Sequence, residues 1–173
     1  KKIMNHFILS KTNGKARRAT LKTRRGNIET PIFMPVATRA AIKGGVSFEE
    51  LYEAQTQICL ANTYHLHLRP GSKLIEKMGG IHKWMKCKLP VLTDSGGFQV
   101  FSIERKKITD EGVWFNSHID GKRFYLDAES SINIQHEIGS DIIMAFDECP
   151  PSELKDFQMH EYDLPDPHFG NKG

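Results

Sequence analysis

A short apolar segment ends on a carboxylate and two glycines, an arrangement that could bind a flat aromatic ring. Residues 90–93 are apolar and β-branched, which predicts a buried strand, and Asp94 follows directly. Gly96 and Gly97 have no Cβ, so a planar ligand could come close to the backbone there, and Phe98 offers a stacking surface. These residues predict a pocket for a planar base. The alternative is an ordinary Asx-type turn followed by a core phenylalanine.

A second carboxylate occupies the same kind of position later in the chain. Residues 141–146 form another apolar run that predicts a strand, and this run ends on Asp147. A further strand, predicted over residues 57–61, is followed by the polar and aromatic residues 62–65. Because strands alternate with helices at this spacing, the chain predicts βαβ units, a parallel sheet and an α/β fold class. The three strand ends would share one face of a barrel or one crevice of an open sheet.

Two hairpins accompany these units. Residues 16–23 and 28–36 are predicted to be extended segments joined by a turn at 24–27, which gives an amino-terminal β-hairpin. Residues 113–115 and 124–126 predict a second hairpin, inserted before the last helix.

Several helix boundaries carry capping signals. Ser47 and Glu50 have the spacing of a capping box, and Asp127 and Gly139 have the residue types of an N-cap and a helix-ending glycine. The same signals and the apolar periodicity predict two later helices, over residues 71–78 and 128–138. Residues 81–86, between them, are predicted to form a turn.

Composition describes an ordinary globular protein. The chain has 173 residues, of which 39% are hydrophobic and 26% charged, and this supports a single domain with a buried core. The formal net charge of +3 is mild. One cluster of basic residues, in the predicted amino-terminal hairpin, could contact phosphates; alternatively, these residues only form the solvent-exposed face of the hairpin. Its members are Lys15, Arg17, Arg18, Lys22, Arg24 and Arg25.

Cysteine and histidine spacing gives no sign of a metal site. Cys59, Cys87 and Cys149 are odd in number, far apart and without a C-x-x-C pair. His65 and His67 alternate as on a strand and have no cysteine partner at ligand spacing. We therefore expect no metal in this chain and no stoichiometric zinc on metal analysis. With neither a signal peptide nor a membrane-spanning run, we expect a cytoplasmic protein.

Five blocks of sequence together resemble one enzyme family. They are residues 30–38, 60–66, 68–71, 90–102 and 139–149. In this order they resemble the tRNA-guanine transglycosylases, which exchange a guanine base in tRNA for a 7-deazaguanine at the wobble position in queuosine biosynthesis. The resemblance covers roughly residues 15 to 150, which correspond to the amino-terminal part of such an enzyme.

The resemblance implies a partial TIM (β/α)8 barrel, with the amino-terminal β-hairpin and the inserted hairpin added to it. A complete barrel usually needs about 250 residues, so we expect this chain to be a truncated form. Residues 1–150 would be the amino-terminal part of the barrel. Residues 151–173, which are rich in proline and lack an apolar period, would be a divergent and irregular tail.

The resemblance also assigns roles within the pocket. Guanine has two donors on its Watson–Crick edge, and a carboxylate can accept both. By resemblance Asp147 recognises the base, Asp94 is the general acid/base and Phe98 stacks on the base. The alternative for Asp147 is an N-cap or a structural ion pair. The substrate-binding residues expected from the family are Asp94, Ser95, Gly96, Gly97, Phe98, Asp147 and Cys149.

Other groups that the family uses have no counterpart here. Exchange with retention requires a carboxylate nucleophile, which the family carries in its carboxyl-terminal half together with a structural zinc site. We therefore expect this chain alone to be inactive. The expected partners are tRNA, guanine and 7-deazaguanine bases, with a homodimer in full-length forms. Two alternatives are an archaeosine-type tRNA transglycosylase and a non-catalytic tRNA-binding or partner subunit.

Overall fold

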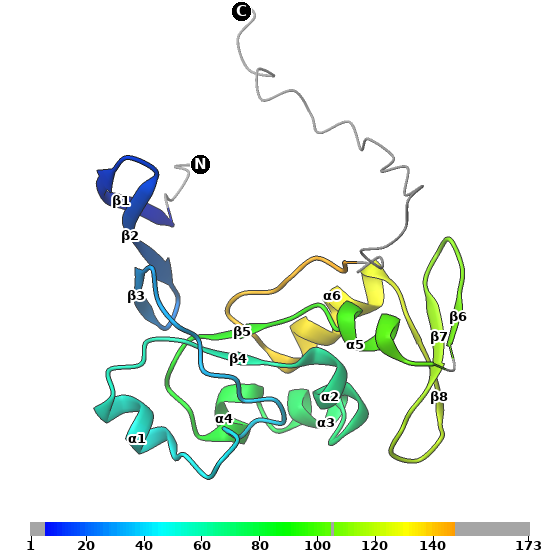
Figure 1. Ribbon diagram of the computed structural model, residues 1–173. Coiled ribbons are helices and arrows are strands. Elements are labelled where there is room, and N and C mark those ends of the chain that lie inside the picture. Colours follow the sequence, from blue (N-terminus) through cyan, green and yellow to red (C-terminus); the bar gives the residue numbers. More distant parts are fainter. Residues whose placement is uncertain (1–5, 105, 148–173) are drawn as a thin grey trace, which may run out of the picture.

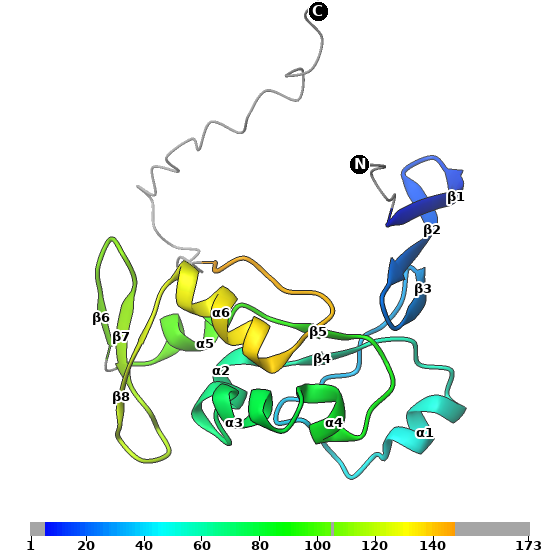
Figure 2. The same cartoon turned by 180° about the vertical axis from the view of Figure 1, so that it is seen from behind.

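The computed structural model describes residues 6–104 and 106–147, and within them it has a mixed α/β fold (Figure 1). Both views in Figures 1 and 2 place an amino-terminal sheet and an inserted sheet at opposite ends of the molecule, with β4 and β5 between them. The amino-terminal sheet is antiparallel and contains β1 (Phe7–Asn13), β2 (Ala16–Thr23) and β3 (Gly26–Thr30). The inserted sheet is also antiparallel and contains β6 (Lys106–Ile108), β7 (Val113–Asn116) and β8 (Arg123–Leu126).

The predicted hairpins are present, but each has one more strand than the sequence indicated. β2 pairs with β3 and β7 pairs with β8, as predicted. β1 and β6 were missed. Both lie at the edge of their sheet, and β1 is exposed along its whole length, so neither strand shows the alternation of apolar and polar residues that marks a half-buried strand.

The central sheet is parallel and follows the order of the chain. β4 (Cys59–Ala61) pairs with β5 (Val91–Thr93), and single parallel bridges add Val36 on the β4 side and Ile142 on the β5 side. Four successive segments therefore run side by side in one direction, which is the arrangement expected of consecutive βα units. Within the described residues these segments do not close into a barrel.

Two predicted strands are shorter than expected. The strand predicted over residues 28–36 ends at Thr30, and beyond it only Val36 forms a bridge, because Pro31 and Pro35 have no N–H to donate. The strand predicted over residues 141–146 is reduced to the bridge at Ile142. Its partner β5 ends at Thr93, so residues 143–147 have no β-ladder partner in the described part of the chain.

The helices are short, and capping accounts for their boundaries only in part. They are α1 (Phe48–Glu53), α2 (Thr63–Leu68), α3 (Ser72–Lys77), α4 (Ile81–Met85), α5 (Gly97–Ser102) and α6 (Ala128–Ile138). The capping box of Ser47 and Glu50 is confirmed, as are the Asp127 cap and the left-handed Gly139. The turn predicted over residues 81–86 is instead α4, and α2 and α5 were not predicted.

The inference that His65 and His67 alternate on a strand is wrong, because both lie in α2. No helix in the described ranges is long and apolar enough to cross a membrane.

One buried carboxylate joins the amino-terminal sheet to the end of α6. The Asp141 side chain has no exposed surface, and its Oδ1 accepts a hydrogen bond of 2.7 Å from Arg24 Nε. Arg24 also donates to the carbonyl oxygens of Gly139 and Ser140. On the other side, Asp141 Oδ2 lies 2.9 Å from both the Val91 amide nitrogen and His82 Nε2. Burial raises the pKa of Asp141, but these partners outweigh burial and lower it to about 2.

Because of this carboxylate, the free energy of unfolding should depend on pH in the acid range. The folded pKa of Asp141 lies below its ordinary value of 3.8, so the stabilisation is present above about pH 4 and is lost as the pH falls towards 2. The loss should be about 2 kcal/mol of the free energy of unfolding. Urea unfolding of the parent and of Asp141→Asn across this range measures it, with exposed Asp110→Asn as the control. Asp141→Asn should flatten the pH dependence; a variant that kept the full slope would contradict the assignment.

Candidate active site

Asp94 lies where β5 ends, and the carboxyl end of β4 holds it in place. The Thr63 amide donates to Asp94 Oδ1 at 2.8 Å, and the Asn62 side-chain amide donates to Oδ2. The Thr63 hydroxyl donates to the Asp94 carbonyl oxygen at 2.5 Å, and Gln99 Nε2 lies 3.4 Å from Oδ2. The carboxylate is therefore oriented by two neighbouring strand ends. The sequence predicted polar groups at the β4 end but not their contact with Asp94.

The turn after Asp94 connects it to Asp147. Gly96, the N-cap of α5, has a left-handed conformation, with φ of 81°. The Ser95 hydroxyl accepts a hydrogen bond from the Gly97 amide at 3.0 Å and donates one to Asp147 Oδ1. A Cβ on Gly97 would lie 2.1 Å from the Asp147 carbonyl oxygen. Glycine at this position therefore lets the backbone of Asp147 pack directly against the turn.

These side chains line one cavity of about 430 Å³. Asp94 is half-buried and Asp147 exposed, so solvent reaches both. Phe98 is 64% exposed, so its ring is free to stack on a planar ligand. The lining residues are Asp94, Ser95, Gly96, Phe98, Gln99, Met144, Ala145 and Asp147.

Most of the residues proposed from the sequence are thus together. Five of them line the cavity, and Gly97 contacts Asp147 beside it. Cys149 lies outside the described residues. Three lining residues were not predicted: Gln99, Met144 and Ala145. The only signal for Gln99 was its place next to Phe98, and the other two belong to a run that the sequence marked as an apolar strand.

An aromatic and histidine group adjoins α2 next to Asp94. The Tyr64 hydroxyl lies 3.0 Å from His118 Nδ1, and the two rings stack with centroids 5.9 Å apart. Burial lowers the pKa of His65, and the positive charge of Arg39 lowers it further, although Asp94 acts in the opposite direction. His65 is therefore mostly neutral at neutral pH, with one ring nitrogen as donor and one as acceptor.

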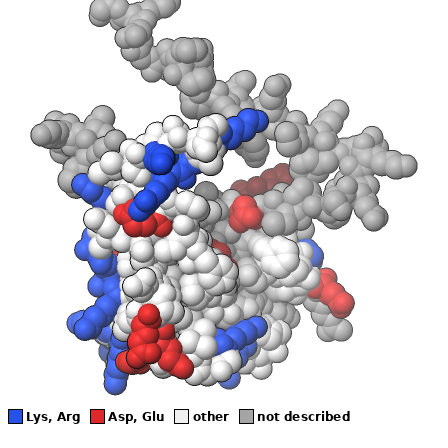
Figure 3. Space-filling model, turned by 60° about the vertical axis from the view of Figure 1, so that its left-hand side comes forward, with Lys and Arg blue, Asp and Glu red and all other residues white. Residues whose placement is uncertain are grey.

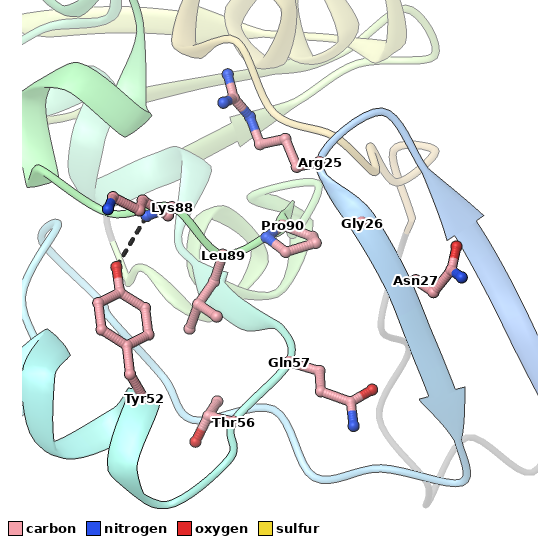
Figure 4. A pocket seen from close by; sticks show the side chains of 9 residues that line it. All are labelled: Arg25, Gly26, Asn27, Tyr52, Thr56, Gln57, Lys88, Leu89 and Pro90. Carbon is pink, nitrogen blue, oxygen red and sulfur yellow. Dashed lines mark hydrogen bonds between the residues drawn. The ribbon is translucent and has the colours of Figure 1, made fainter.

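A second cavity, of about 480 Å³, lies at the opposite ends of the strands (Figure 4). Gln57 and Pro90 line it, and these residues precede β4 and β5. The Tyr52 hydroxyl accepts a hydrogen bond from the Lys88 amide at 2.9 Å across one wall. Ligands of parallel α/β sheets bind at the carboxyl ends of the strands. We therefore assign the functional site to the cavity that contains Asp94.

The basic cluster of the hairpin lies on the surface. All six of its side chains are exposed, and two of them, Arg24 and Arg25, lie within 4 Å of Asp141. Figure 3, which brings the side of β1 to β3 forward, shows Lys and Arg gathered along one edge of this face. Within the described residues, no group of three or more His, Cys, Asp or Glu side chains could hold a metal ion.

Comparison with known proteins identifies the family. A family model described as queuine tRNA-ribosyltransferase matches residues 12–162. A queuine tRNA-ribosyltransferase of Clostridium perfringens (strain 13) is 56% identical over 147 residues, which are 84% of this chain and 39% of that protein. One of Clostridium botulinum (strain Hall) is 56% identical over 144 residues, 83% of this chain and 38% of that protein. The chain spans about two fifths of the length of these relatives. It belongs to the queuine tRNA-ribosyltransferase family.

Proposed function

We propose that this chain forms the guanine-binding part of a tRNA-guanine transglycosylase, which exchanges guanine for a 7-deazaguanine at the tRNA wobble position. The observation that carries the proposal is that Asp94, Phe98 and Asp147 line one cavity at the carboxyl ends of parallel strands. The four parallel segments in chain order suit the first part of a (β/α)8 barrel. Because tRNA is the proposed substrate, we also propose a cytoplasmic location for this activity.

Asp147 is the group proposed to read the base. Guanine donates from N1 and from its exocyclic amine, and a carboxylate accepts both in a bidentate way. The hydrogen bond from Ser95 fixes one Asp147 oxygen, so the orientation of the carboxylate is set before a ligand arrives. Phe98 would cover one face of the base, and a cavity of about 430 Å³ has room for a bicyclic ring.

Asp94 is the group proposed to carry the proton. When the bond between ribose C1′ and guanine N9 breaks, the base leaves with the electron pair and needs a proton. The incoming 7-deazaguanine gives up its N9 proton as its nitrogen bonds to C1′. One carboxylate can serve both steps, first as acid and then as base. The intermediate, in which ribose is bound to an enzyme carboxylate, needs the nucleophile that family resemblance places in the carboxyl-terminal half of such enzymes.

Base binding tests this proposal on the full chain. Calorimetry should give clear binding of guanine, and hypoxanthine, which lacks the exocyclic amine, should bind about tenfold more weakly. Adenine should bind weaker still, because its Watson–Crick edge presents an acceptor at N1. Equal affinity for adenine and guanine, or no guanine binding at all, would overturn the proposal. A chain that bound tRNA but not guanine would instead be a tRNA-binding subunit.

A further inference from the structure

Two buried polar side chains of α6 form hydrogen bonds with the two segments that carry Asp94 and Asp147. Ser131 and Gln135 lie four residues apart, on the same face of the helix, and neither has exposed surface. The Ser131 hydroxyl donates to the Ser95 carbonyl oxygen at 2.6 Å, and so reaches the turn that follows Asp94. Gln135 reaches the segment that leads to Asp147. The helix thus contacts both carboxylate-bearing segments through hydrogen bonds.

Gln135 uses every hydrogen-bonding position of its amide. Its Oε1 accepts from the Met144 amide and from the Thr93 hydroxyl, both at 2.9 Å. Its Nε2 donates to the Met144 carbonyl oxygen at 2.9 Å and lies 3.3 Å from the Ser131 hydroxyl. The orientation of the amide is fixed by these contacts, because exchanging oxygen and nitrogen would place donor against donor at the Met144 N–H.

The contact with Met144 replaces a missing strand neighbour. Residues 143–147 have no β-ladder partner in the described chain, since β5 ends at Thr93. A ladder partner would supply one acceptor and one donor to the backbone of a residue in this segment. Gln135 supplies the same pair from a side chain. Without it, both backbone groups of Met144 would lose their partner inside the protein.

We propose that Gln135 is a positioning residue, which sets the place of Asp147 relative to Asp94 by holding the backbone of Met144. Gln135 touches no ligand in this assignment and does not line the cavity. Its effect passes through Met144, three residues before Asp147, and through Thr93, immediately before Asp94. The expected change in guanine affinity rests on the proposed function. The expected change at the Met144 backbone rests on the hydrogen-bond geometry alone.

The test compares Gln135→Met with the parent chain. Methionine has nearly the same length but cannot hydrogen-bond to Met144, so the Met144 amide should exchange with deuterium about tenfold faster or more. The Leu126 amide, in β8, should keep its rate. The dissociation constant for guanine should rise by about tenfold in the same variant. Exposed Asn133→Met, on the same helix, is the matched control and should leave both quantities unchanged.

A second variant separates positioning from general stability. Gln135→Glu keeps the acceptor for the Met144 N–H, but while its carboxyl is ionised its second oxygen faces the Met144 carbonyl oxygen and repels this segment; when protonated, the carboxyl again offers one donor and one acceptor. The excess exchange at Met144, relative to the parent at the same pH, should therefore shrink as the pH falls. If Gln135→Met does not fold, this pH-dependent recovery still tests the contact.

The outcomes distinguish the two proposals. Unchanged Met144 exchange in folded Gln135→Met, or faster exchange with the parent's guanine affinity, would overturn the positioning role. A parent chain that does not bind guanine would overturn the proposed function instead. The exchange of Met144 in the variants would then still decide whether Gln135 holds this segment.

Discussion

Gly97→Ala should lower the affinity for guanine by roughly 100-fold, the upper end of what overpacking costs. The added Cβ would lie 2.1 Å from the Asp147 carbonyl oxygen and 3.1 Å from Oδ1. No side-chain rotation relieves this clash, because the closest atom belongs to the backbone. Asp147 must therefore move away from the turn, and its hydrogen bond with Ser95 is lost as it moves.

Calorimetric titration with guanine measures this loss, and thermal unfolding shows whether the variant is folded. Gly121→Ala is the control for an added methyl group, since a Cβ there meets no atom within 4 Å; its φ is positive, unlike that of Gly97. It should lose some stability but no affinity for guanine. If Gly97→Ala bound guanine as tightly as the parent, the packing of Asp147 against this turn would not matter for the ligand.

Asp147→Asn should weaken guanine binding by roughly 1 to 3 kcal/mol, or about 10- to 100-fold. Asparagine has the same size, and its remaining oxygen can still accept from Ser95. The other oxygen becomes an NH2 group that faces the donors of guanine, so one favourable contact becomes unfavourable.

Asp94→Asn should leave guanine affinity within a few-fold of the parent, because the proposed role of Asp94 is proton transfer.

Two measurements separate these roles. Calorimetry on the full chain gives guanine affinity for each variant. Exchange of labelled guanine into tRNA requires this segment to be joined to the carboxyl-terminal part of a curated relative. In that chimera Asp94→Asn should slow exchange far more than it weakens binding. Unchanged guanine affinity in Asp147→Asn, or exchange at the parent rate in Asp94→Asn, would show that the roles are assigned wrongly.

Signals local to a few residues predicted several helix ends correctly. The caps at Ser47 and Asp127 and the glycine at 139 set helix ends through short-range hydrogen bonds and backbone freedom, so their residue types are sufficient. The helices α2 and α5 could not be predicted in this way. Each has six residues, too few to show a helical period, and neither has a side-chain cap.

The sequence also placed Asp94 correctly at the end of a strand, but it could not show what surrounds the carboxylate. Gly97 was interpreted as room for a ligand, whereas its open side is filled by Asp147, fifty positions away. Gln135 had no signal at all, because a glutamine in a helix is ordinarily a surface residue. Its importance depends on where β5 ends, and only the tertiary structure shows that.

The order of the parallel segments bears on how the chain folds as it is synthesised. Each segment pairs with its neighbour in sequence, so every βα unit can dock on the previous one as it leaves the ribosome. The bond between Arg24 and Asp141 spans 117 positions and is an exception. It can form only when nearly all of the described chain has been made. The amino-terminal hairpin therefore waits for the residues that anchor it, and the apolar side chains of Ile8 and Leu9 in its edge strand stay exposed meanwhile.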